Sequence, residues 1–249
     1  MKVVYHPRYE EVYTSDPAAK AGRMESITRE VSLHFEFATP EPASLDDVRL
    51  AHSEGHIDYI RKRVPTCEIA LLAAGGAITA AEMAVSGEPA FGLIRPPGHH
   101  ASRNHCWGFC YFNNVAISIA RLRQAGKVNK ALILDIDLHY GDGTDDIFSG
   151  VPEVAYFHPE GRGRRDFVDQ VSRCLDSTQA DIVAVSAGFD RHVHDWGRLL
   201  DTEDYRTIGR LAKDWSERHC RGRRYGVLEG GYNQDVLGRN VKALLDGMT

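Results

Sequence analysis

The sequence predicts one α/β domain built on a mostly parallel β-sheet, and three observations support this prediction. Short apolar runs alternate with longer stretches in which apolar residues recur three and four positions apart. A chain of 249 residues that is 43% hydrophobic can bury one sizeable core. We see no repeat, low-complexity tract or linker. We therefore expect a single domain over residues 1–249.

Each predicted strand is a short apolar run that ends in Gly, Pro or polar residues, and each predicted helix has apolar residues at helical spacing. Asp and Thr near helix starts, and a Gly at the end of the Ala-rich stretch, are typical of helix caps. In chain order we expect a strand at 3–5, helices at 24–37 and 70–87, a strand at 90–95, a helix at 114–125, strands at 130–137 and 153–158, a helix at 166–179, a strand at 181–188, a helix at 202–220, a strand at 225–230 and a helix at 234–248.

Composition argues against several classes of protein. The formal net charge of -5 gives no general attraction to nucleic acid or to an anionic membrane. The N-terminus lacks an apolar signal core, and we expect no membrane span, because no run approaches about 18 apolar residues. Five cysteines without metal-ribbon spacing indicate reduced thiols rather than a disulfide framework. We expect a soluble, cytoplasmic protein.

Four predicted strands are followed by unusually polar segments. They read RPPGHH (95–100), LDIDLHYGDG (134–143), SAGFD (186–190) and LEGGYN (228–233). In an open parallel sheet, ligands bind outside the carboxyl ends of the strands. We therefore expect the side chains of these four segments to form one site.

Asp135, Asp137 and His139 alternate with apolar residues, so they would project to one side if the strand stayed extended. A divalent metal would neutralise the carboxylates and bind the imidazole, and a catalytic zinc typically takes about three protein ligands and an exchangeable water. Asp137 and His139 are candidate ligands. Asp190, after a second buried strand, is the candidate third ligand, although an isolated Asp in that position is more commonly a helix cap.

His99 and His100 follow a rigid Pro-Pro-Gly turn, and Asp135 and Asp142 are available to bond one nitrogen of each ring. Tyr232, after two glycines, could pack in the core or donate a hydrogen bond to an oxyanion. A metal, a histidine base and a phenol donor together predict hydrolysis of an amide or ester.

These residues are similar to the motifs of the zinc-dependent histone deacetylase family, which includes the acetylpolyamine amidohydrolases. RPPGHHA, GFCYFNNVAI, LDIDLHYGDG, SAGFD and LEGGYN occur in the family's order, and the likeness runs from about His52 to the C-terminus. The resemblance implies an arginase/deacetylase-type three-layer fold and a single deacetylase-like catalytic domain. It implies an enzyme that removes an acetyl or related acyl group from an amine, such as acetyl-lysine or an acetylpolyamine.

Position by position, the resemblance implies that Asp137, His139 and Asp190 hold zinc, with iron(II) an open alternative. His100 would be the general base for the metal-bound water, with Asp142 as its carboxylate partner. His99, paired with Asp135, would be the second histidine, and Tyr232 would be the donor to the acyl oxygen. Gly108, Phe109 and Gly230 would line the substrate channel. Arg23 would be a buried arginine behind the acetate pocket.

Two departures from the family concern the rim of the site. Only residues 64–67 separate YIRKR from the Ala-rich stretch, and His158 is followed by PEGRGRRDF rather than by a Gly-rich segment that supplies an aromatic wall. We expect a shallow channel, open on one side, that admits bulky or unusual acyl amides, or a second subunit of a homo-oligomer that completes it. The arginines at 162–165 stand where the rim is missing and could attract an anionic substrate or partner. The commoner alternative is that they are the solvated start of a helix.

A third departure concerns the monovalent cation that the family binds near the first Asp of DxDxH. Tyr156 stands where a serine is usual, yet Asp135 and nearby carbonyls could still hold potassium. Two other functions stay open. One is an arginase-type ureohydrolase with two manganese ions, and the other is a non-catalytic acyl-lysine binding subunit.

Overall fold

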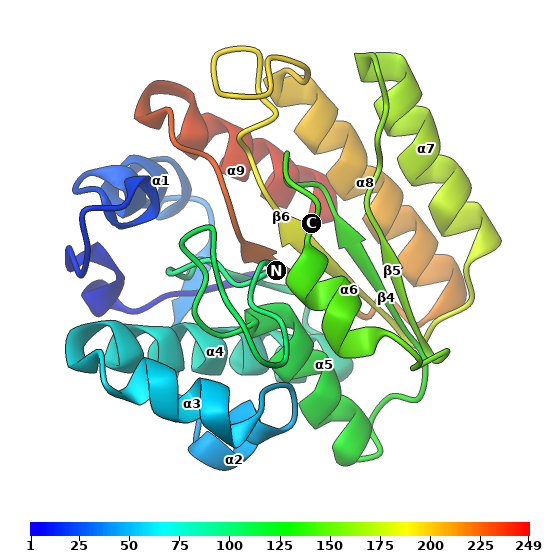
Figure 1. Ribbon diagram of the computed structural model, residues 1–249. Coiled ribbons are helices and arrows are strands. Elements are labelled where there is room, and N and C mark those ends of the chain that lie inside the picture. Colours follow the sequence, from blue (N-terminus) through cyan, green and yellow to red (C-terminus); the bar gives the residue numbers. More distant parts are fainter.

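The computed structural model describes all 249 residues and contains one seven-stranded sheet in which all neighbouring strands are parallel (Figure 1). The prediction of an α/β fold on a mostly parallel sheet is confirmed. The strands are β1 (Lys2–Val4), β2 (Glu36–Ala38), β3 (Ala90–Gly92), β4 (Ala131–Asp135), β5 (Val154–Phe157), β6 (Ile182–Ala187) and β7 (Arg224–Leu228). Their order across the sheet is β2-β1-β3-β7-β6-β4-β5.

Helices cover both faces of this sheet and give the fold three layers (Figure 1). On one face, α4 (Val64–Val85) packs on β1, β3 and β7 and alongside α5 (Asn114–Gln124), with α2 (Leu45–Arg49) and α3 (Glu54–Arg61) outside them. On the other, α1 (Arg23–Val31), α9 (Gln234–Met248), α8 (Thr202–His219) and α7 (Arg164–Ser177) lie in a row, each in contact with the next. The short α6 (Asp142–Phe148) contacts α5 and β5. Buried apolar side chains from both layers form one continuous core.

The strand order explains why the four polar segments meet. They follow β3, β4, β6 and β7, which are four consecutive strands of the sheet in the order β3-β7-β6-β4. Parallel pairing keeps their carboxyl ends level, with Asp135 opposite Ser186 and Ser186 opposite Val227. Segments far apart in the sequence therefore emerge side by side at one edge.

The predicted helix over 24–37 is wrong in its second half. Helix α1 ends at Val31, and Glu36–Ala38 form the edge strand β2, paired with β1. Glu36 and Phe37 are exposed, so this strand lacks the buried alternation that marks a half-buried strand. Its conformation comes from pairing with β1, which local sequence does not reveal.

Helix α4 begins at Val64, so residues 64–67 are its first turn and not a loop. With 22 residues, it is long and apolar enough to cross a membrane by length and composition alone, contrary to the expectation that no such stretch exists. Yet 67% of its most apolar window is buried within the protein. Its contacts with β1, β3, β7 and α5 are those of a core helix.

Candidate active site

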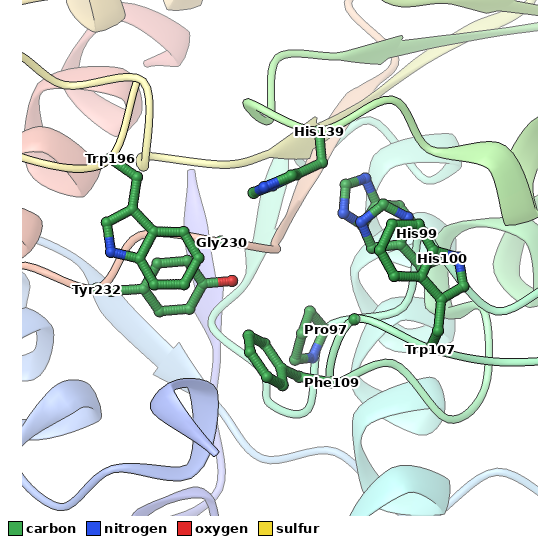
Figure 2. A pocket seen from close by; sticks show the side chains of 10 residues that line it. Pro97, His99, His100, Trp107, Phe109, His139, Trp196, Gly230 and Tyr232 are labelled. Carbon is green, nitrogen blue, oxygen red and sulfur yellow. The ribbon is translucent and has the colours of Figure 1, made fainter. Parts of the chain in front are cut away.

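A cavity of about 130 Å³ opens at the carboxyl ends of the four central strands (Figure 2). Its wall contains residues from three of the four polar segments and from the loops before α5 and α8. The lining residues are Pro97, His99, His100, Trp107, Gly108, Phe109, His139, Trp196, Gly230 and Tyr232. Every residue to which the sequence assigned catalysis or substrate binding lines this cavity, apart from the two carboxylates Asp135 and Asp142, which lie behind the histidines.

Asp137 and His139 are held by hydrogen bonds within a turn and not by strand alternation, because β4 already ends at Asp135. Asp135 Oδ1 accepts from the amide of Asp137 at 3.0 Å, and Asp137 Oδ1 accepts from the amide of His139 at 2.9 Å. Each carboxylate thus captures the backbone N–H two residues on, a local bond that Asp forms readily. The DxDxH spacing therefore fixes the turn as well as supplying ligands.

The three candidate metal ligands converge on one point. Their donor atoms all lie within 4.8 Å of one another, and His139 Nδ1 is 3.3 Å from both Asp137 Oδ1 and Asp190 Oδ2. Asp190 Oδ1 accepts from the amide of Leu138 at 3.0 Å, so this residue is no helix cap. Its Oδ2 is buried without any hydrogen-bond partner. A buried carboxylate oxygen beside a second carboxylate and an imidazole fits a divalent metal.

The electrostatics of this cluster call for a cation. Burial and the neighbouring Asp137 carboxylate raise the pKa of Asp190 to about 6. Burial acts in the same direction on Asp137, but the charge of His99 and hydrogen bonds from His139 and Gly230 outweigh it and lower the pKa of Asp137. Two buried carboxylates in contact repel each other, and a divalent ion relieves this repulsion.

Two glycines allow the ligands to pack this closely. A Cβ at Gly188 would lie 2.2 Å from Asp137 Oδ2, and a Cβ at Gly230 would lie 2.5 Å from the same atom and 2.9 Å from Asp190 Oδ2. Gly230 also donates its N–H to Asp137 Oδ2 at 2.8 Å. The glycines of SAGFD and LEGGYN therefore shape the metal cluster from the neighbouring strand ends.

The pKa values of the two histidines shift in opposite directions because their surroundings differ. Burial lowers the pKa of His100 to about 4, helped by the charge of His99 and opposed by the Asp142 carboxylate. His100 Nδ1 lies 2.6 Å from Asp142 Oδ1, so Nδ1 carries the proton and Nε2 is the basic nitrogen. Burial also disfavours charge on His99, but the carboxylates of Asp137 and Asp135 raise its pKa well above the ordinary value.

The phenol of Tyr232 points into the cavity (Figure 2). Burial raises the pKa of Tyr232, so its hydroxyl is a donor at neutral pH. Asp195 accepts hydrogen bonds from the amides of Tyr232 and Asn233, both at 2.8 Å. The buried Arg23 donates to the carbonyls of Gly231 and Glu229 at 2.8 and 2.6 Å, with its guanidinium 5.6 Å from the Tyr232 ring centroid. These contacts fix the turn that aims the phenol.

Two tryptophans that the sequence did not single out flank the site. Trp107 lies 3.9 Å from the His100 ring, centroid to centroid, and donates to Asp142 Oδ2 at 2.8 Å. Trp196 stacks on Tyr232 at 4.1 Å. Phe109, with a positive φ of 67°, directs its ring toward Tyr232 from a third side. An aromatic residue in a loop is a common core feature, so sequence alone gave no signal for the tryptophans.

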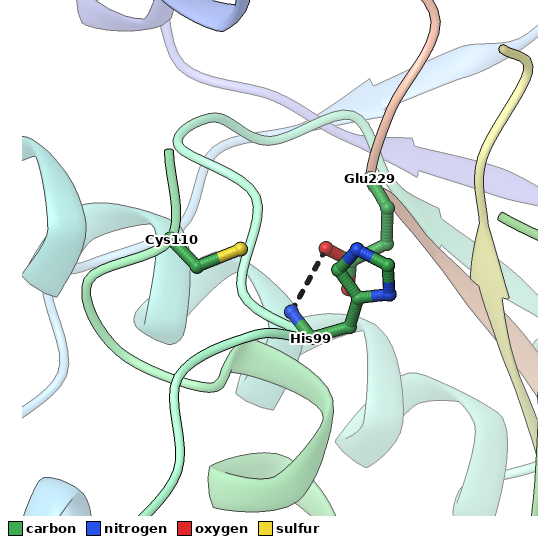
Figure 3. Close-up of side chains that lie close together, drawn as sticks. All are labelled: His99, Cys110 and Glu229. Carbon is green, nitrogen blue, oxygen red and sulfur yellow. Dashed lines mark hydrogen bonds between the residues drawn. The ribbon is translucent and has the colours of Figure 1, made fainter. Parts of the chain in front are cut away.

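A second cluster of metal-ligand types, His99, Cys110 and Glu229, is held in place by hydrogen bonds within the protein (Figure 3). Glu229 accepts from the amides of Gly98 and His99 at 2.7 and 3.2 Å. Burial raises the pKa of the Cys110 thiol well above its ordinary value, which disfavours the thiolate form in this structure. His99 Nδ1 is bonded to Asp135 at 3.0 Å. We interpret this cluster as support for the histidine turn, and it does not favour a two-metal ureohydrolase.

The arginine cluster is set apart from the cavity. None of Arg162, Arg164 and Arg165 lines it. Arg164 forms ion pairs with Asp201 and Asp204, so its charge is compensated at the start of α8. This contact favours the solvated helix start over attraction of an anionic substrate.

Comparisons with known proteins match one family model, several relatives and a solved structure. The model of the histone deacetylase domain matches residues 17–163 and 158–248. The chain is 29% identical to a probable deacetylase of Methanothermobacter thermautotrophicus, covering all of this chain and 90% of the relative, and 33% identical to one of Archaeoglobus fulgidus, covering 92% and 77%. A histone deacetylase-like amidohydrolase of Pseudomonas aeruginosa is 30% identical over 67% of this chain and 54% of its own. The crystal structure of the HDA15 HD domain superposes with a TM-score of 0.85 at 22% identity, covering 98% and 90%, which shows the shared fold.

Proposed function

This chain belongs to the histone deacetylase family, a family of deacetylases and amidohydrolases, and from this premise we propose that it is a zinc-dependent deacetylase that removes an acetyl or related small acyl group from an amine. The observation that carries the proposal is the convergence on one cavity of the three-ligand cluster, a neutral histidine backed by a carboxylate, and a protonated phenol. A protein that only binds acylated amines needs no such acid-base set.

Asp137, His139 and Asp190 would hold the zinc ion, which when bound supplies Lewis acidity and lowers the pKa of water. His100 Nε2 takes the proton of the attacking water, since Asp142 fixes the opposite nitrogen and Trp107 holds both partners. Tyr232 donates its hydroxyl proton in a hydrogen bond to the acyl oxygen as negative charge builds there. His99, whose pKa the carboxylates of Asp137 and Asp135 raise, is placed to stabilise this negative charge and to protonate the leaving amine.

The dimensions of the cavity indicate the size of the group that enters. At about 130 Å³ it is well below the roughly 300–1,000 Å³ of pockets for drug-sized ligands. We therefore infer an acetyl or similarly small acyl group on a slim alkyl amine, and not the bulky acyl amide that a shallow channel would admit. Trp107 and Trp196 are 48% and 51% exposed at its mouth. We infer an open rim that contacts little of the amine beyond its alkyl chain, unless a second subunit covers it.

The experiment is acetate release by zinc-loaded protein from a matched panel of an acetyl-lysine peptide, free acetyl-lysine and acetylated polyamines. We expect turnover of at least one of them and none by zinc-free protein. Preference for a small amine identifies a polyamine or metabolite deacylase, and preference for the peptide identifies a protein substrate. Zinc binding without turnover of any acetylated or longer acylated amine would contradict the proposal, as would urea release from a guanidino substrate.

A further inference from the structure

Arg191 is a buried side chain that joins three strand-end loops beside the metal cluster. It follows Asp190 directly and is only 6% exposed. Its Nε donates to the carbonyl of Asp137 at 2.9 Å, and its Nη2 donates to the carbonyls of Leu138 at 3.3 Å and Pro159 at 3.2 Å. Nη2 also lies 2.8 Å from His158 Nε2. One guanidinium thus ties together the loops that follow β4, β5 and β6.

His158 is arranged to accept from this guanidinium. Burial lowers the pKa of His158, so its ring is neutral and Nε2 has a lone pair for the Arg191 N–H. The guanidinium also lies 4.8 Å from the ring centroid of Phe167, on α7. Arg191 is therefore held by polar contacts at its edges and by an aromatic ring on its face, a geometry suited to arginine and not to lysine.

The carboxylate oxygens of Asp135, near which the family's potassium would bind, also face hydrogen-bonding groups of the protein. Asp135 Oδ1 accepts from the amide of Asp137 at 3.0 Å. Asp135 Oδ2 accepts from the Tyr156 hydroxyl at 3.0 Å and faces His99 Nδ1 at 3.0 Å. The Tyr156 oxygen in turn accepts from the amide of Gly141 at 2.8 Å. Both carboxylate oxygens already face hydrogens of the protein.

These contacts do not fit a potassium ion. Such an ion needs a shell of oxygen atoms that turn their lone pairs toward it. Here the carbonyls of Asp137 and Leu138 face Arg191, and the carboxylate of Asp135 faces N–H and O–H groups. The fixed charge of Arg191 would also repel a second cation.

We propose that Arg191 is a positioning residue whose guanidinium takes the place of a monovalent metal cation, so that the site keeps its geometry and its turnover without potassium. The positive charge opposes the carboxylates of Asp135, Asp137 and Asp190, as a bound cation would. Because Arg191 bonds the carbonyls of Asp137 and Leu138, within the turn that carries two metal ligands, its effect reaches the reaction through Asp137 and His139.

The inference rests on the proposed function only for its turnover measurement, so thermal unfolding of the zinc-loaded protein tests it separately. The protein is compared in potassium, sodium and tetramethylammonium chloride at equal ionic strength. We expect kcat/KM and the unfolding midpoint to agree between salts, within about twofold for kcat/KM. A saturable rise of either quantity with potassium alone would overturn the proposal. If no substrate is turned over, the proposed function fails while the unfolding midpoint still decides the cation question.

Arg191→Ala uncovers the carbonyls and removes the charge. We expect this variant to lose zinc retention and turnover, and to regain part of both with potassium or added guanidinium. Arg173→Ala removes an arginine whose side chain is 66% exposed on α7 and is the matched control, expected to be unchanged. If Arg191→Ala does not fold, Arg191→Lys replaces it, with a lower unfolding midpoint and lower turnover expected because lysine cannot bridge three loops. A variant at Arg191 that equals the unmodified protein in both measurements would refute the positioning role.

Discussion

Tyr232→Phe separates catalysis from binding, because it removes one oxygen and leaves the ring in place. The ring stacks on Trp196 and meets Phe109 edge to face, and both contacts persist with phenylalanine. The Tyr232 hydroxyl forms no hydrogen bond with another protein group. The backbone amide of Tyr232 is held separately, by a hydrogen bond to Asp195. The substitution therefore leaves no unpaired polar partner behind.

The expected magnitude follows from the role of the hydroxyl. Loss of one donor to a developing oxyanion typically costs about 10²–10³ in kcat, or about 3–4 kcal/mol. The free energy of unfolding should change by no more than about 0.5 kcal/mol, because packing is kept. Zinc content should be unchanged, since Tyr232 is no ligand.

The assay is acetate release with the best substrate of the panel, together with zinc content and urea unfolding of the same preparation. Tyr59→Phe, at an exposed tyrosine on α3, is the matched control and should be fully active. A Tyr232→Phe variant that retains a third or more of the turnover would refute the assignment of the phenol as the oxyanion donor.

Two further predictions concern protonation and packing. His100 must be neutral to act as a base, and burial lowers its pKa to about 4. We therefore expect kcat/KM to fall only when the pH drops well below 6.5, the pKa of a free imidazole. An acid limb at or above pH 6.5 in the pH profile would contradict this role. Gly188→Ala places a Cβ 2.2 Å from Asp137 Oδ2, so zinc affinity, measured by competition with a chelating dye, should fall at least tenfold. Gly55→Ala is the control and should bind zinc normally, because nothing lies within 4 Å of a Cβ at that position.

More of the site than of the surrounding structure could be predicted, because the site residues are concentrated in short segments after strands. RPPGHH, DIDLH, SAGFD and LEGGYN are local patterns, and the rule that ligands bind at the carboxyl ends of parallel strands is enough to bring them together. The strand order β3-β7-β6-β4, which makes the four segments neighbours, could not be predicted from the sequence. Strand alternation does not explain the DxDxH spacing, since the turn after Asp135, and not an extended strand, aligns the ligands.

Features that depend on tertiary contacts were missed. The edge strand Glu36–Ala38 is exposed and carries no periodic signal. Trp196 and Arg191 lie in an irregular loop between β6 and α8, and only the folded chain places one against Tyr232 and the other against the carbonyl of Asp137. The sequence shows Tyr156 as a departure from the family, but a single residue type does not reveal its bond to Asp135.

Titration of zinc into metal-stripped protein, followed by acetate release from the best substrate, tests the central claim most directly. The cluster of Asp137, His139 and Asp190 predicts that turnover is absent without metal and saturates at one zinc per chain. Turnover that survives complete removal of metal, or that requires two equivalents, would contradict a deacetylase with a single metal ion in this site.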